Sequence, residues 1–117
     1  MIKPKYKLEN DLKRFMIRAH REIYGKGPKE AWVKINFNTA TFYCFEPLTA
    51  LEEFLLKTEG GEEEVKMIRE KVDVRIKTHL CSEIECLTGI KVLDMVSKVC
   101  TSTNCIFGVI HFEENFE

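Results

Sequence analysis

The hydrophobic positions of the chain follow two periods, and each period predicts a different kind of element. Near the N-terminus, apolar residues recur at intervals of three and four, which places them on one stripe of an amphipathic helix. Glycine adopts the left-handed conformation of a helix C-cap and proline cannot continue a helix, so this helix should end at Gly25. The stripe consists of Leu8, Leu12, Phe15, Met16, Ala19 and Ile23.

The next two stretches alternate with a period of two and predict a β-hairpin. Residues 31–37 and 40–45 are rich in aromatic and β-branched side chains, and Asn38-Thr39 separates them. Side chains on alternate positions share one face of such a hairpin, and we expect one of its faces to enter the core. That face should hold Val33, Ile35, Phe37, Ala40, Phe42 and Cys44.

Two further helices should follow. Thr49 and Glu52 have the spacing of a capping box, which predicts a short helix to about Lys57, ended by Gly60-Gly61. A longer helix should begin at the acidic residues 62–64, whose charge suits a helix N-terminus, and end at Gly89. Its apolar positions are Val65, Ile68, Val72, Ile76, Leu80, Ile84 and Leu87.

A second hairpin completes the chain. Residues 90–99 and 105–112 read as strands around the turn formers at 101–104. The order αββααββ predicts a single α+β domain over residues 1–117. We expect two layers, a four-stranded, mainly antiparallel sheet with its helices on one face.

The other face of this sheet would be half apolar. If helices cover only one side, that surface stays exposed and predicts a homodimer or a partner-binding sheet. The alternative is a helix that wraps over and makes both faces core. The apolar members are Trp32, Tyr43, Phe45, Val92, Val96, Phe107 and Val109, mixed with Lys34, Asn36, Thr41, Asp94, Lys98 and His111.

Composition limits the class of protein. The chain is 44% hydrophobic and 32% charged, which favours a folded core over disorder. Its 18 basic and 19 acidic residues give a net charge of -1, so no positive field attracts nucleic acid or an anionic membrane. Charges interrupt every apolar stretch well before the roughly 20 residues that span a bilayer, and the first residues lack a signal peptide's apolar region. We expect a cytoplasmic protein that does not insert into membranes.

The turn Gly25-Lys26-Gly27-Pro28 has two interpretations. Its backbone N–H groups and its ammonium could contact an anion or a partner, as glycine-rich loops do. It is not a P-loop, because it follows a helix C-terminus, where the dipole repels anions. Structural capping is the simpler interpretation.

The five cysteines are expected to be reduced thiols in a chain without an export signal. Cys81 and Cys86 point about 140° apart on a helix, which disfavours a zinc site shared with Cys100 and Cys105. Cys100 and Cys105 flank a four-residue turn, so they are the alternative pair for metal binding or oxidation.

No arrangement typical of an enzyme is visible. His20, His79 and His111 fall on different predicted elements, and none has a partner at a spacing typical of a metal or catalytic pair. Thr49 and Glu52 are better explained as a helix cap than as an active pair. We expect no enzyme and no cofactor.

Several of these features together resemble the MpsC-like domain family, named for a sodium-translocating, membrane-potential-generating system. The resemblance implies a small soluble protein linked in some members to membrane transport of sodium or inorganic carbon, and it implies no enzyme. Residues 97–104 lack the acidic residues that the family's final turn carries. The similar positions are a helix ending in a tyrosine before Gly25-Lys26-Gly27-Pro28; Leu48-Thr49, Glu52 and Leu55; Gly61, Val65 and Arg69; and Ile84-Glu85, Thr88-Gly89 and Val92.

Our hypothesis from the sequence is a homodimeric accessory or regulatory domain of a membrane transport protein. Candidate contact residues are Gly25, Lys26, Gly27, Pro28, Trp32, Tyr43, Phe45 and Phe107. The alternative is a small-ligand or metal-binding sensor built around the paired cysteines or the glycine turn.

Overall fold

The computed structural model describes residues 3–116 and has the expected order of elements, αββααββ. The α+β class is therefore confirmed. The elements are α1 (Lys5–Tyr24), β1 (Glu30–Asn36), β2 (Thr39–Phe45), α2 (Ala50–Leu56), α3 (Gly61–Thr88), β3 (Val92–Cys100) and β4 (Cys105–Phe112).

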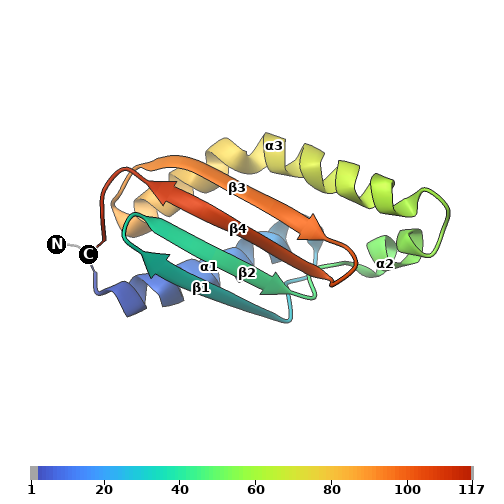
Figure 1. Ribbon diagram of the computed structural model, residues 1–117, viewed down its shortest axis with the longest axis horizontal. Helices are drawn as coiled ribbons and strands as arrows, with labels where there is room; N and C mark the ends of the chain where they lie inside the picture. Colours follow the sequence, from blue (N-terminus) through green and yellow to red (C-terminus); the bar gives the residue numbers. More distant parts are fainter. Residues whose placement is uncertain (1–2, 117) are drawn as a thin grey trace.

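The strands form one four-stranded antiparallel sheet in the order β1-β2-β4-β3. Each predicted hairpin is present, and the pairing of β2 with β4 joins the two hairpins at the centre of the sheet. Figure 1 shows the four strands side by side, with α1 and α3 running behind them in that view.

The core lies between the sheet and helices α1 and α3. The strand positions that face it alternate along the sequence, and in β1 every second residue is buried. Both helices direct apolar side chains into the same cluster. Its members are Leu8, Leu12 and Phe15 of α1, Ile84 of α3, and Val33, Ile35, Ala40, Phe42, Ile90, Val92, Ile110 and Phe112.

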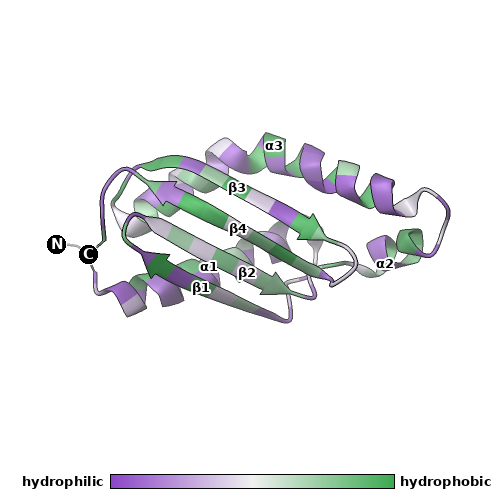
Figure 2. Ribbon diagram, viewed as in Figure 1, coloured by the Kyte–Doolittle hydropathy of each residue, from purple (hydrophilic) through white to green (hydrophobic). Residues whose placement is uncertain are grey.

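Helix α3 is longer than the sheet that it packs on. Its 28 residues span about 42 Å, and its N-terminal end, together with α2, extends past the end of the strands (Figure 1). Hydrophilic and hydrophobic residues alternate along this helix (Figure 2). Ile68, expected on its apolar stripe, is 45% exposed. The projecting part must therefore be held by contacts other than the main core.

The structure corrects the position of Phe37. The sequence placed this residue in a strand facing the core, but β1 ends at Asn36 and the turn is Phe37-Asn38. Phe37 has a positive φ of 54° and is 67% exposed. Two-residue hairpin loops require positive φ, which glycine or asparagine usually provides, so the phenylalanine concealed the turn.

Val92 is the second correction. It was expected on the face opposite the helices, but it is buried in the core, opposite Phe112. An irregularity between Val92 and Asp94 shifts the register, so that Asp94 pairs with His111. One extra residue in a strand moves the side chains on its two sides to opposite faces of the sheet. Val92 therefore faces the core, while Val96 lies on the face predicted for it.

We predict that Gly61→Ala destabilises the fold by about 1–3 kcal/mol. A Cβ atom at Gly61 would lie 1.6 Å from the carbonyl oxygen of Leu55, so α2 would have to move away from α3. Equilibrium urea unfolding measures the change. Gly27→Ala is the matched control, because its Cβ would meet Ile17 at 3.4 Å, an ordinary contact. Equal losses in the two variants would contradict the prediction.

Candidate functional site

A buried ion pair joins α2 to α3. The Arg69 side chain is 3% exposed and the Glu52 side chain 6%. The Nε and Nη2 atoms of Arg69 each donate to a different carboxylate oxygen of Glu52, both at 2.6 Å. This two-point geometry is the strongest form of charge-assisted hydrogen bond between side chains.

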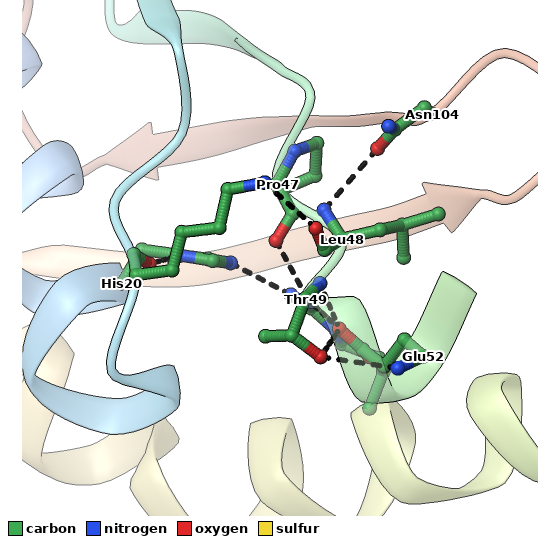
Figure 3. A network of polar contacts seen from close by, with 8 residues as sticks. His20, Pro47, Leu48, Thr49, Glu52 and Asn104 are labelled. Atoms are coloured by element: carbon green, nitrogen blue, oxygen red, sulfur yellow. Dashed lines mark hydrogen bonds and ion pairs between the residues drawn. The ribbon is translucent and has the colours of Figure 1, made fainter. Parts of the chain in front are cut away.

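The guanidinium of Arg69 also contacts three residues on two other segments. Its Nη1 atom donates to Nε2 of His20 at 2.9 Å, and its Nη2 atom donates to the carbonyl of Pro47 at 3.1 Å. The ring of Tyr24 lies 3.8 Å from the guanidinium carbon, a cation–π distance. Arg69 therefore connects the end of α1, the segment after β2, α2 and α3; Figure 3 shows this polar network from close by.

The capping box places Glu52. The hydroxyl of Thr49 accepts from the backbone N–H of Glu52 at 3.2 Å, and the backbone N–H of Thr49 donates to the Glu52 carboxylate at 2.9 Å. The predicted box is confirmed. The box holds the Glu52 carboxylate at the first turn of α2, where the carboxylate also accepts hydrogen bonds from Arg69.

The turn Gly25-Lys26-Gly27-Pro28 binds the segment between β2 and α2, which contains Leu48. Gly25 is the left-handed C-cap of α1, with φ 77°, as predicted. The ammonium of Lys26 donates to the carbonyl of Leu48 at 2.8 Å, and the carbonyl of Lys26 accepts from Nδ1 of His20. Since Lys26 is engaged within the chain, the turn has a structural role; a contact of Gly25-Lys26-Gly27-Pro28 with a ligand or partner stays a prediction.

The β3–β4 turn holds this segment from the other side. The side-chain oxygen of Asn104 accepts from the backbone N–H of Leu48 at 3.2 Å (Figure 3). The backbone carbonyl of Asn104 accepts from the N–H of Glu46 at 2.9 Å. The positive φ of Asn104, 50°, suits an asparagine in a turn. The segment between β2 and α2 is thus fixed on both sides.

The network sets the protonation of its members. Because Nε2 of His20 accepts from Arg69, the proton of the neutral ring lies on Nδ1. Burial, followed by the positive charge of Arg69, lowers the pKa of His20 below its usual 6.5. Burial alone would raise the pKa of Glu52, but hydrogen bonds from Arg69 and Thr49 outweigh it and hold that pKa below its usual value. Burial raises the pKa of Tyr24 to about 12.

The face of the sheet opposite the core holds the predicted aromatic contact residues. Trp32, Tyr43 and Phe107 are successive partners across β1, β2 and β4. Phe45 lies beside Tyr43, with ring centroids 4.7 Å apart. Trp32, Tyr43 and Phe45 line a shallow hollow of about 290 Å³. We call this surface, defined by Trp32, Tyr43, Phe45 and Phe107, the aromatic face; Trp32 is 50% exposed on it.

The cysteines do not assemble into one cluster. Cys100 and Cys105 are opposite each other across the β3–β4 hairpin, whereas Cys81 and Cys86 lie on α3. Within residues 3–116, no three His, Cys, Asp or Glu side chains are grouped so that they could hold a metal ion. All five cysteines are free thiols.

Sequence reasoning missed the network around Arg69. Arg69 was noted only through the family resemblance, and no partner was identified for His20. One signal was available, because Arg69 lies four residues after Val65 on the inward side of α3, where a cation needs a buried partner.

We predict strong coupling between Arg69 and Glu52. Arg69→Met leaves a buried carboxylate unpaired and should cost about 3–5 kcal/mol of unfolding free energy. Adding Glu52→Gln removes that charge, so the double variant should lose less than the sum of the single losses, by at least about 1 kcal/mol. Urea unfolding of all four proteins gives the coupling energy. The exposed Arg18–Glu83 pair is the control and should couple by about 0–1 kcal/mol; equal coupling would refute the prediction.

A pH dependence follows from His20. Its folded pKa lies below its unfolded pKa, so the unfolded state binds more protons as the pH falls through 6.5. Stability should be complete above this value and decrease below it, where protonated His20 would face the guanidinium of Arg69. Glu52 keeps its charge over that range, since its pKa is depressed below 4.5.

Thermal unfolding between pH 7.5 and 5.5 measures this effect. His20→Gln, which stays neutral, should remove much of the decrease, whereas His79→Gln on the exposed side of α3 should leave it unchanged. An unaltered pH profile in His20→Gln would show that another group is responsible.

Comparison with known proteins completes the description. No helix of residues 3–116 has both the length and the apolar character needed to cross a bilayer. Neither the curated proteins nor the solved structures include a significant match. A family model described as Na+-translocating membrane potential-generating system (MpsC) matches residues 4–114. The match spans nearly the whole chain and includes Arg69, Glu52 and the glycine turn, so the chain belongs to the MpsC family.

Proposed function

We propose that this protein is a non-enzymatic accessory or regulatory domain of a sodium-translocating membrane system, and that it acts as a homodimer assembled through the aromatic face. The family's description supports the link to membrane sodium transport. The exposure of Trp32 and its neighbours is the observation on which the dimer rests. Free cysteines are typical of a reducing compartment, which supports a cytoplasmic site of action.

The distribution of burial supports a sheet with helices on one face only. The inward positions of β1 and β2 are buried against α1, whereas the outward positions remain accessible. On the outward side, Phe107 is 43% exposed and Val96 58%. Grouped apolar side chains of this kind mark association surfaces in soluble proteins.

The charges on this face suit a second copy of the same chain. Lys34 and Lys98 lie on β1 and β3, the two edge strands, and Glu30 lies on β1 on the same side of the sheet. In a twofold interface, a residue away from the axis faces a different residue of the second copy. A surface whose rim carries both positive and negative charges can therefore pair with a second copy of itself. The aromatic row across β1, β2 and β4 would form its centre.

The polar network supports a non-enzymatic role. Within residues 3–116, every buried side-chain nitrogen and oxygen has a hydrogen-bond partner. The members of the network whose pKa values are shifted, His20, Tyr24 and Glu52, all contact Arg69. These contacts hold α1, α2 and α3 together, and this is the role that we assign to the cluster.

A cavity between α1 and α3 favours the sensor as the second candidate. It measures about 100 Å³ and has mostly apolar walls from α1, α3 and the sheet, with Arg69 and Asp73 among its polar lining residues. That volume suits a ligand of a few heavy atoms. Native mass spectrometry of the purified protein separates the two candidates, because a small molecule bound in stoichiometric amount would favour the sensor.

We predict that Trp32→Lys converts the dimer to a monomer. A lysine on the aromatic face would place a charge against the aromatic side chains of the second copy, where it has no partner. Size-exclusion chromatography with light scattering gives the mass over a range of concentrations. Leu51→Lys is the matched control, since Leu51 is 67% exposed on α2, away from the sheet. A wild-type monomer at micromolar concentration would refute the dimer.

The same pair of variants tests the link to transport. Cells that lack this protein should show a reduced sodium-dependent membrane potential, measured with a voltage-sensitive dye. The wild-type chain and Leu51→Lys should restore the potential, whereas Trp32→Lys should not. An unchanged potential in the deletion strain would contradict the transport role but leave the dimer intact.

A further inference from the structure

The β3–β4 hairpin ends in two cysteines that its register places face to face. Cys100 is the last residue of β3, Cys105 is the first of β4, and the two are partners in the ladder. Residues directly opposite in an antiparallel pair have Cα atoms about 4.5 or 5.5 Å apart. Disulfides span Cα separations of about 4.4–6.8 Å, so the backbone is already positioned for a bond between these residues.

The two sulfur atoms share a polar environment. The hydroxyl of Thr103 lies 3.2 Å from Sγ of Cys105 and also hydrogen-bonds to Cys100. The hydroxyl of Ser102 lies 3.4 Å from Sγ of Cys100. Because one hydroxyl contacts both sulfurs, the two thiols lie on the same side of the hairpin.

The two thiols differ in access and in ionisation. Cys100 is partly exposed, whereas Cys105 is 2% exposed. Hydrogen bonds from Ser102, then from Thr103, lower the pKa of Cys100 to about 7, so a large fraction is thiolate at neutral pH. An accessible thiolate next to a sheltered thiol is the arrangement found in redox-sensing pairs.

We propose that Cys100 and Cys105 form a reversible redox site, in which hydrogen peroxide oxidises Cys100 and Cys105 then closes a cross-strand disulfide. The evidence for this site rests neither on the proposed transport function nor on the dimer, although Cys105 lies opposite Phe45 of the aromatic face. It replaces the metal-binding alternative for the pair with a modification site.

The chemistry balances in two steps. The Cys100 thiolate attacks one peroxide oxygen, an S–O bond forms, the O–O bond breaks, and the departing hydroxide takes a proton to become water. The sulfur of Cys105 then attacks the sulfenic sulfur, the S–S bond forms, the S–O bond breaks, and hydroxide leaves with the Cys105 proton as a second water. Two thiols are oxidised by two electrons in total and one peroxide is reduced to two waters.

The other cysteines provide internal controls. Cys81 and Cys86 are five residues apart on α3, so they point about 140° away from each other and cannot bridge while the helix is intact. Cys44 is buried, and burial raises its pKa to about 11, which leaves almost no thiolate. Cys86 is exposed, but it lies on helix α3 and no cysteine is placed opposite it as Cys105 is placed opposite Cys100.

Tryptic mapping of the full chain after peroxide treatment tests the proposal. Cleavage after Lys98 leaves Cys100 and Cys105 in one peptide, residues 99–117, whereas Cys81 and Cys86 fall in residues 78–91. We expect the first peptide to lose two hydrogens at low peroxide, to recover them with a dithiol reductant, and to react at least about tenfold faster than Cys86. Oxidation of peptide 78–91 first, or no disulfide in 99–117, would overturn the proposal.

Two single variants separate the roles of the thiols. In Cys105→Ser the second step is blocked, so a sulfenic acid should accumulate on Cys100 and be trapped by a dimedone probe. In Cys100→Ser the sheltered Cys105 should remain a thiol under the same conditions. Circular dichroism checks that each variant is folded. Trapping at Cys105 but not at Cys100 would overturn the assignment, and equal trapping in both variants would also refute it.

Discussion

The buried charge of Arg69 is the constraint on which the rest of the structure depends. Removing a guanidinium and a carboxylate from water costs several kcal/mol per ion, and only good geometry offsets that cost. Here the offset requires the two-point contact with Glu52, the acceptors on His20 and Pro47, and the face of Tyr24 at the same time. Displacing α2 would leave a charge without a partner, and displacing α1 or the segment between β2 and α2 would leave an N–H group of the guanidinium without its acceptor. The network therefore fixes one arrangement of these elements.

This constraint explains how the projecting end of the molecule is held. Helix α2 has seven residues, too few to be stable alone. The N-terminal end of α3 extends beyond the ends of the strands (Figure 1). Three devices attach this end. Gly61 lets the α2 backbone approach α3, Val65 is fully buried, and Arg69 binds Glu52. These residues lie one helical turn apart, so a single side of α3 provides all three.

Period and turn chemistry predicted the fold but not the network. Hydrophobic spacing located α1 and α3, and Gly25 and Gly89 marked their ends with left-handed φ. The errors, Phe37 and Val92, lie where one residue changes the count, at a turn and at a strand irregularity, because local spacing does not report register. Sequence reasoning assigned Glu52 to its cap, which is confirmed, but its contact with Arg69 joins residues 17 positions apart and depends on how α2 folds back on α3.

The two faces of the sheet have different roles, and the β3–β4 turn lies at their boundary. The inward face and the network around Arg69 account for burial within the chain, whereas aromatic residues on the outward face stay exposed, and the proposed association rests on that exposure. Asn104 in the turn binds the segment that leads to Glu52, while Cys105, the next residue, lies opposite Phe45 and hydrogen-bonds to Tyr43. A covalent change at this turn therefore acts where the internal scaffold meets the association surface.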